Sequence, residues 1–414
     1  MISNLSDVIH ALPPMRSGRE LTKALTVLPA YSEEIRTADV ATRLMALTDL
    51  YKLYIPSAMS TEIYSKLYLA LLRSLQKKGT KLAVRQRNQN FRAIIQQEYS
   101  GIMGGSDSFT IIGASGIGKS TAISRAISLI TKNRMIDVSE PYVRIAPCIC
   151  VQCPFDSSVK GLLLDILLKI DDYIDSDYYE NVVRKRATTD MLIGNVSQVA
   201  LNHIGLLIVD EIQNVCSSKN GKSLIGALTQ LINNSGISIC MVGTPESAVF
   251  FEQAMQLARR SVGLRYDVME YGSEFRTFCE VLYSYQYVKK KTNLTDGIIY
   301  WLYEHSSGNV SVVVSLIHDA QEIAILNGTE ALNLETLNEA YTKRLSLLHE
   351  FIEPSVKKIK TSKSKETASA IVPDTENEPN KDFTISSLVS QAKDSGMDIV
   401  DFLKTHFAVI EVRV

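Results

Sequence analysis

Two short motifs hold residue types at a spacing suited to phosphate chemistry. The first, Gly113-Ala-Ser-Gly-Ile-Gly-Lys-Ser120, matches G-x-x-x-x-G-K-[ST] in full. In such a loop the backbone N–H groups turn inward around phosphate oxygens, and glycines permit that turn. Lys119 would reach the β- and γ-phosphates, and the Ser120 hydroxyl would ligate Mg²⁺. The residues expected to surround ATP and Mg²⁺ here are Gly113, Ser115, Gly116, Ile117, Gly118, Lys119, Ser120 and Thr121.

The second motif is an apolar run, residues 206–209, that ends in Asp210 and Glu211. This pattern predicts a buried central strand that ends at a polar site. Asp210 would hold the Mg²⁺ directly or through water, and Glu211 would act as the general base for the attacking water. An Asp-Glu pair at this place favours the ATPases with an additional strand over small-molecule kinases and GTPases. We therefore expect Mg-dependent ATP hydrolysis.

The elements that position these motifs are predicted from apolar patterns. Short apolar runs at 109–112, 143–153, 205–211 and 237–244 alternate with amphipathic stretches. That alternation predicts an α/β fold with a central parallel sheet flanked by helices. The phosphate motif then lies between a strand and the helix that begins near Thr121, where the helix N-terminus attracts anions.

The overall composition indicates a globular protein with a near-neutral average charge. The 414 residues include 44 Lys+Arg and 45 Asp+Glu, and 45% are hydrophobic. The first 100 residues nevertheless carry 14 basic and 8 acidic side chains, and no acid occurs between Glu62 and Glu98. Apolar residues at four-residue spacing predict an amphipathic helix over 61–78. Its basic residues form either a solvated face or a surface for DNA or an acidic partner.

The remaining chain divides into helical and polar stretches. Residues 295–346 read as all-helical, with Gly308 and Gly328 as stops. The polar segment near 354–380 is typical of a disordered linker. The predicted domains are a helical N-terminal extension 1–95 (basic over 63–97), a nucleotide-binding core 96–290, a helical lid 291–350, a linker 351–383 and a C-terminal partner-binding module 384–414.

Cysteine and histidine patterns favour neither disulfides nor a metal centre. Six Cys in 414 residues are too sparse for a disulfide scaffold. Cys148, Cys150 and Cys153 lie in a predicted strand and have no second cluster to complete a tetrahedral site. No secretory signal or membrane span is visible, so we expect a cytoplasmic protein.

The core also resembles the AAA+ ATPases, and this resemblance implies further site residues. The strand at 238–244 ends in Thr244, which would be sensor 1. The resemblance implies an arginine finger from a neighbouring subunit, for which Arg260 is preferred and Arg259 and Arg265 are rivals. In the helical lid, Ser311 stands where a sensor 2 arginine would be, which puts nucleotide sensing by the lid in doubt.

Four segments together are similar to the TnsC/TniB family of transposon ATPases: GASGIGKST, VQCPFDSSVKGLLLDIL, LLIVDEIQNV and MVGTPES. The resemblance covers roughly residues 95–345. It implies ATP-dependent rings or filaments on double-stranded target DNA in a bacterial cytoplasm. It also implies two partners: a transposase of the TnsA/TnsB type and a target selector of the TniQ or TnsD type, which includes selectors coupled to a CRISPR effector.

In that family, basic residues on the inner face of the ring follow the DNA backbone. Lys160, in the loop after Cys153-Pro-Phe-Asp156, is the best match, and Arg184, Lys185 and Arg186 also qualify. The other interpretation of each is a solvated surface charge. Contacts to phosphates position a protein without reading sequence.

Three other functions remain compatible with the sequence. The chain could be a replication-initiator or helicase-loader ATPase, which shares the fold and the arginine finger. It could be a STAND-like signalling switch without DNA binding, although only about 70 residues follow the lid. It could also be an ATP-dependent scaffold without turnover.

Overall fold

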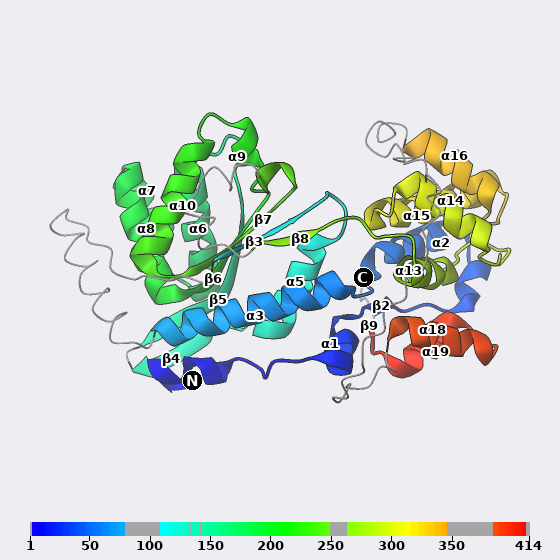
Figure 1. The fold of residues 1–414 in the computed structure, drawn as a ribbon, viewed down its shortest axis with the longest axis horizontal. Coiled ribbons are helices and arrows are strands. Elements are labelled where there is room, and N and C mark those ends of the chain that lie inside the picture. The colour runs from blue at the N-terminus through cyan, green and yellow to red at the C-terminus, as the bar shows by residue number, and fades with distance from the viewer. Residues whose placement is uncertain are drawn as a thin grey trace, which may run out of the picture. The chain divides into compact units, whose positions relative to one another are not determined.

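A computed structural model describes residues 2–78, 108–132, 134–140, 142–248, 263–345 and 384–410. The chain forms two compact units (Figure 1). Unit 1 combines Met1–Ser17 with Pro56–Asp267, and unit 2 combines Gly18–Ile55 with Val268–Val414.

Unit 1 is built on a seven-stranded sheet in the order β1-β4-β5-β6-β7-β3-β8. Neighbouring strands run parallel except β4 and β5. All residues of β3 and β7 are buried, as expected for a parallel sheet covered on both faces. The strands are β1 (Ile2–Asn4), β3 (Phe109–Gly113), β4 (Ile136–Glu140), β5 (Val143–Gln152), β6 (Ile204–Asp210), β7 (Ser238–Gly243) and β8 (Leu264–Tyr266).

Helices cover both faces of this sheet (Figure 1). On one face lie α6 (Val159–Ile174), α8 (Thr189–His203) and α10 (Gly221–Ser235), and on the other lie α3 (Ala58–Lys78) and α5 (Lys119–Thr131). Alternate residues of β6 and β7 pack in one core with α6, α8 and α10, because successive side chains of a strand point to opposite faces of the sheet. The predicted α/β fold with a mostly parallel sheet is confirmed. Shorter elements are η1 (Leu5–Ala11), α7 (Tyr178–Arg184) and α9 (Asn214–Ser217).

Helix α3 confirms the predicted amphipathic helix and changes the interpretation of its charge. Ile63, Leu67 and Leu71 are fully buried in unit 1. Lys78, counted in the basic stretch, is buried as well, and its Nζ donates to Ala200 O and Leu201 O at 3.0 and 2.6 Å. It caps the C-terminal end of α8, where a cation is favourable. Lys78 therefore contributes no surface charge, and the basic residues from Lys81 to Arg92 lie outside the described residues.

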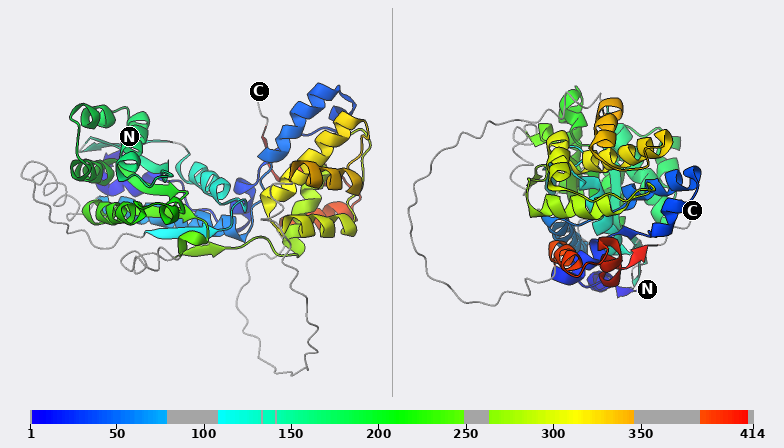
Figure 2. Two further views of the ribbon diagram at one scale, coloured as in Figure 1. Left: turned by 90° about the horizontal axis from the view of Figure 1, so that it is seen from above. Right: turned by 90° about the vertical axis from the view of Figure 1, so that its right-hand side faces the viewer.

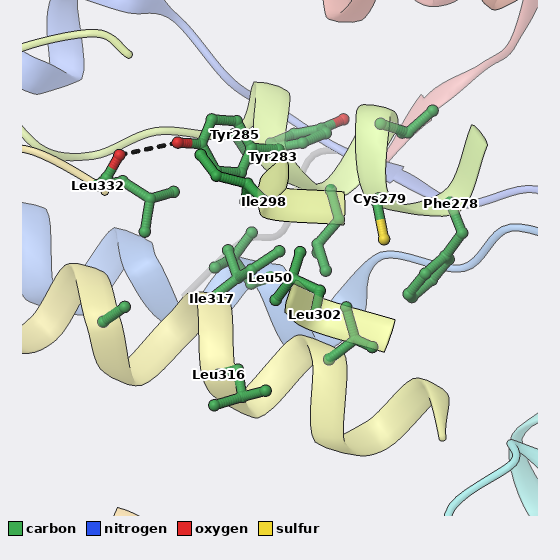
Figure 3. Close-up of a cluster of buried hydrophobic side chains, with 14 of the residues drawn as sticks. Leu50, Phe278, Cys279, Tyr283, Tyr285, Ile298, Leu302, Leu316, Ile317 and Leu332 are labelled. Atoms are coloured by element: carbon green, nitrogen blue, oxygen red, sulfur yellow. Dashed lines mark hydrogen bonds between the residues drawn. The ribbon is translucent and has the colours of Figure 1, made fainter. Parts of the chain in front are cut away.

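The core of unit 2 is formed by four helices that confirm the predicted helical region and extend it toward the N-terminus. They are α13 (Ser273–Ser284), α14 (Asp296–Ser306), α15 (Val310–Asn327) and α16 (Leu334–Arg344). Figure 3 shows side chains of α13, α14 and α15 in one buried cluster with Leu50, and the Tyr283 hydroxyl donates there to Leu332 O at 2.8 Å. Phe275 and Phe278 of α13 belong to this cluster. The second segment of unit 2 therefore begins at Val268, before the predicted lid boundary of 291.

Residues 18–55 were assigned to the N-terminal extension, but they pack with the lid helices. Figure 2 shows this segment, in blue, against α15 in yellow. Buried Arg43 donates two hydrogen bonds to Glu330, at 2.7 and 2.8 Å, and a third to Tyr287 O. A bidentate ion pair of this kind joins segments almost 290 residues apart. The elements here are α1 (Gly18–Leu25), β2 (Leu28–Pro29), η2 (Glu33–Thr37), α2 (Val40–Leu47) and η3 (Thr48–Lys52).

The C-terminal module is part of unit 2 (Figure 2). It comprises α18 (Ile385–Asp394), α19 (Ile399–His406) and β9 (Val409–Ile410), and β9 pairs with β2 in parallel. Its apolar residues join the lid core, and Lys393 forms an ion pair with buried Glu280 of α13. The apolar face predicted to meet a partner thus packs within the chain, and a partner role for this module stays a prediction. The predicted linker 351–383 lies outside the described residues.

One described helix, α15, is long and apolar enough to cross a membrane by length and composition. Half of it is buried, with Val313, Leu316 and Ile317 in the centre of the lid core. Core helices of globular proteins pass the same test, so this is weak evidence for a membrane span.

Candidate active site

The phosphate motif forms a tight loop between β3 and α5. Gly116 and Gly118 adopt φ of 81° and 94°, a region that favours glycine. A Cβ on Gly113 would lie 2.6 Å from Tyr266 O, so only glycine fits beside β8. Gly118 is also the N-cap of α5, and no side chain caps that end. The first N–H groups of a helix have no acceptor within it, so this uncapped end next to the loop is suited to an anion, as the predicted phosphate cradle requires.

Lys119 lies inside the loop. Its side chain is almost fully buried, and Nζ donates to Gly113 O and Ala114 O at 2.7 and 2.8 Å. Burial lowers the pKa of Lys119, while the charges of Asp210, Glu211 and Glu246 raise it. The three carboxylates therefore help to keep a desolvated ammonium charged at the position where phosphates are expected.

Ser120 and Asp210 meet at the carboxyl edge of the sheet. Ser120 Oγ donates to Asp210 Oδ2 at 2.8 Å, although 90 residues separate them. The strand order explains the encounter, because β7 lies between β6 and β3 and aligns their ends. This inserted strand is the feature predicted from the Asp-Glu pair. A hydroxyl and a carboxylate oxygen at this separation are suitable Mg²⁺ ligands.

Glu211 has an unusual backbone for a non-glycine residue. Its φ is +58°, in the left-handed region, and its N–H donates to Asp210 Oδ1 at 2.8 Å. Its carboxylate is exposed and accepts a hydrogen bond from Gln213 Nε2. Strained residues of this kind cluster at functional sites, where the surrounding structure holds them. The sequence predicted the role of Glu211 but not this geometry, and it left Gln213 without a role.

Thr244 follows β7 directly and lies near Glu246. The Thr244 hydroxyl lowers the pKa of the exposed Glu246 carboxyl, and the charge of Lys119 contributes to the same shift. Thr244 Oγ1 itself is buried and makes no hydrogen bond of ordinary geometry. Glu246 was missed by the sequence reasoning; its signal was a carboxylate two residues after the predicted sensor.

These residues fit a bound nucleotide with Mg²⁺. Gln213 Oε1, like Thr244 Oγ1, is a buried oxygen without a hydrogen bond among the described residues. Buried polar atoms are normally satisfied, so unpaired ones beside Glu211 and Glu246 indicate a place for a further polar group. The glycine loop, the lysine and the Ser120–Asp210 pair supply the remaining donors and ligands.

The residues predicted to complete the site have different outcomes. Arg259 and Arg260 lie outside the described residues, whereas Arg265 is exposed on β8. Ser311 is in the first turn of α15, where its N–H and hydroxyl both donate to the N-cap Asn309 Oδ1 at 3.1 Å. Ser311 thus belongs to the helix cap formed by Asn309, and the expectation that this position provides no sensor 2 arginine to the nucleotide stays a prediction.

The predicted DNA-binding residues are all exposed in unit 1. Lys160 lies in the first turn of α6, not in the loop before it, because Ser158 caps the helix. Arg184 ends α7 and forms an ion pair with Glu180, while Lys185 and Arg186 follow in the next turn. Lys160 and the cluster at residues 184–186 thus lie on different helices, α6 and α7. Their DNA contacts stay predictions.

The cysteines and histidines have structural surroundings. Cys148 and Cys153 are buried and Cys150 is exposed, and all three are free thiols. His318 lies with Asp319 and Glu322, with all ligand atoms within 4.8 Å of one another. Because Asp319 pairs with His318, and Glu322 pairs with Arg344, this group is already satisfied.

A family model described as "AAA domain" matches residues 102–249. This range contains the phosphate loop, β6 with Asp210 and Glu211, and β7 with Thr244. Together with the strand order, the match identifies an AAA+ P-loop fold, which is a nucleotide-hydrolysing type of fold. No protein with curated function matches the chain.

Solved structures show more distant similarity. A structure of the Aeropyrum pernix ORC1 protein in complex with DNA is 14% identical, and the match covers 63% of this chain and 63% of that one, with a TM-score of 0.41. A structure from a study of katanin self-assembly is also 14% identical, and the match covers 63% of this chain and 80% of that one, with a TM-score of 0.33. This chain therefore spans less than two thirds of the ORC1 chain, and no function of this chain follows from either similarity.

Proposed function

We propose that this chain is an ATPase that assembles with ATP on double-stranded DNA and links a target-selection protein to a transposase. The observation that carries the ATPase proposal is the meeting of Ser120, Asp210 and Glu211 at the mouth of a glycine loop. The sequence resemblance to the TnsC/TniB family supports the DNA and transposition parts.

In the proposed chemistry each residue has a separate task. The loop N–H groups and Lys119 bind the phosphates, and Ser120 and Asp210 hold Mg²⁺, which neutralises charge as the γ-phosphate leaves. Glu211 takes a proton from the attacking water. Thr244 positions that water or the γ-phosphate. A finger arginine from a neighbouring subunit, Arg260 or one of its rivals, completes the site, so hydrolysis depends on assembly.

DNA binding by this protein depends on many subunits. The net charge of the chain is −1, so one subunit has little attraction for DNA. Subunits in a ring or filament each add a few cations, such as Lys160 and the cluster at 184–186. Binding that neutralises several phosphates weakens steeply with salt, because counterions are released. ATP therefore acts as a timer: it assembles the subunits, and its hydrolysis dissolves the assembly.

The test is duplex DNA binding with ATP, ADP and a non-hydrolysable analogue, followed by electron microscopy. We expect rings or filaments with ATP or the analogue and none with ADP. The Glu211→Gln variant should bind ATP and DNA like the wild type but release phosphate about a hundredfold more slowly. Monomeric behaviour with every nucleotide would refute the proposal.

Two further outcomes separate the alternatives. If wild type releases phosphate no faster than Glu211→Gln, the chain is a scaffold without turnover. Affinity purification with the assembled complex should recover a transposase and a selector of the kinds named above. Recovery of a replicative helicase in their place would favour the loader function.

A further inference from the structure

The most exposed large apolar side chain among the described residues is Phe155, which is 86% exposed. It follows β5 on the turn of residues 153–158 in unit 1. A phenylalanine in this position loses the free energy of burial, which is about 2 kcal/mol for a side chain of this size. Single exposed apolar residues are common, so Phe155 requires further observations before it indicates a binding site.

The first observation is that the turn is held in place. Asp156 O accepts hydrogen bonds from Ser218 Oγ at 2.7 Å and Asn220 Nδ2 at 3.2 Å. Ser157, fully buried at φ +51°, donates from Oγ to Asn214 O at 3.2 Å. A turn with this many tertiary hydrogen bonds presents Phe155 in one orientation, so its side chain is available to a ligand without a large ordering cost.

The second observation is the charge around this turn. Lys160 lies in the first turn of α6, which directly follows the Phe155 turn, and Lys219 lies on the 218–220 turn that binds Asp156 O. Lys222 is in the first turn of α10, which follows. All three lysines are exposed, and none has an ion pair within the described part of the chain. The acid among them, Asp156, accepts a hydrogen bond from Ser158 N.

We propose that Phe155, Lys160, Lys219 and Lys222 form one DNA-contact surface, in which Phe155 packs on sugars and bases while the lysines contact phosphates. The inference rests on the proposed function and adds three residues to it: Phe155, Lys219 and Lys222. An aromatic residue with lysines on the adjoining segments fits nucleic acid better than protein, because lysine is depleted at protein–protein interfaces. Apolar side chains inserted at base steps are a known mode of sequence-independent DNA contact.

The same turn is hydrogen-bonded to the hydrolytic residues. Cys153 N donates to Asp210 O at 2.8 Å, and Asn214 Nδ2 donates to Cys153 O at 2.8 Å. These bonds join the Phe155 turn to the segment that holds Glu211 at its strained φ. A ligand on this fixed turn is therefore coupled to the Glu211 backbone, and we expect DNA bound there to stimulate hydrolysis.

The test measures binding of a labelled mixed-sequence duplex with the non-hydrolysable ATP analogue, across a series of salt concentrations. Phe155→Ala should weaken binding about tenfold at each salt concentration, since loss of base–aromatic packing is not ionic. The Lys219→Ala/Lys222→Ala pair should reduce the salt dependence, log K against log salt, by about 2. Phe155→Trp should bind within threefold of wild type.

Two controls match these changes elsewhere on the surface. Met191→Ala removes another exposed apolar side chain, 52% exposed on α8, and Lys343→Ala removes an exposed lysine of α16. Both should bind like wild type. DNA should also stimulate phosphate release less in Phe155→Ala than in Met191→Ala, with each rate compared with that of the same variant in the absence of DNA.

Each outcome decides the matter. If Phe155→Ala and the lysine pair bind DNA like the controls, the surface is refuted while the proposed function stands. If wild type binds no DNA with any nucleotide, both fail.

Discussion

The strained backbone at Glu211 allows a substitution test whose sign is set by the structure. We compare Glu211→Gly with Glu211→Ala, because both remove the carboxylate and its hydrogen bond to Gln213. They differ in the backbone. At φ +58° a residue with a Cβ costs about 1–2 kcal/mol, and glycine avoids this cost.

The expected magnitude is the difference of two terms. Glycine is more flexible in the unfolded chain, which destabilises it by about 0.4–1 kcal/mol relative to alanine. The remaining advantage of Glu211→Gly is about 0.5–1 kcal/mol. For a unit of this size that corresponds to an unfolding temperature about 1–4 °C higher than for Glu211→Ala. Both variants should lose about 10²-fold or more in phosphate release, because the general base is absent.

The assay is thermal or urea unfolding of the nucleotide-free protein, together with phosphate release. Gln230, exposed inside α10, is a control position with ordinary helical backbone. There, Gln230→Gly should be less stable than Gln230→Ala by about 1 kcal/mol. If Glu211→Gly is also the less stable member of its pair, the residue is not strained and the reasoning fails.

Three further predictions concern other parts of the chain. Lys119→Ala should abolish both nucleotide binding and assembly, measured by a fluorescent ATP analogue and by sedimentation; assemblies that persist would contradict the coupling. Arg43→Ala should lower stability by about 3 kcal/mol, because it removes the buried guanidinium that binds Glu330 in unit 2 through two hydrogen bonds and leaves that carboxylate with Lys289 alone. Arg43 holds the pKa of Glu330 below its usual 4.5, so the ion pair stabilises the fold above pH 4.5 and this contribution disappears as the pH falls below that value. The variant lacks the ion pair and should therefore lose less stability on acidification than wild type. An equal loss in both proteins would show that the pair does not stabilise the fold. Gly308→Ala should unfold at a lower temperature by several degrees, since φ is +75° and a Cβ would lie 1.9 Å from Met269 O; unchanged unfolding would show that this approach is not tight.

Local features of the site were predictable from the sequence. The conformation of the loop from Gly113 to Ser120 was predictable because its glycines and its lysine are close neighbours in one short segment. The apolar run before Asp210 and the four-residue spacing in α3 are likewise local patterns. Such patterns report which face is buried, because the period of a strand or helix repeats every few residues.

The position of whole segments depended on contacts distant in the sequence. Residues 18–55 pack with the lid through Arg43 and Glu330, and the C-terminal module packs there through β2 and β9. Lys78 read as a surface charge, yet it caps α8 through carbonyls more than 120 residues away. The residues next to a lysine in the sequence do not indicate whether backbone carbonyls of a distant helix accept its hydrogen bonds.

By itself the sequence determined which residues are available for phosphate chemistry: the glycine loop with Lys119, the carboxylate proposed to hold Mg²⁺ and the proposed general base, because each is written in adjacent residues. Only the tertiary structure decided how they meet. Strand β7 lies between β3 and β6, so Ser120 reaches Asp210 across 90 residues, and Glu211 is forced into the left-handed region. It also showed Phe155 exposed on a turn bonded to the Glu211 segment. Strand order and exposure arise from packing between distant segments, and the local sequence does not encode them.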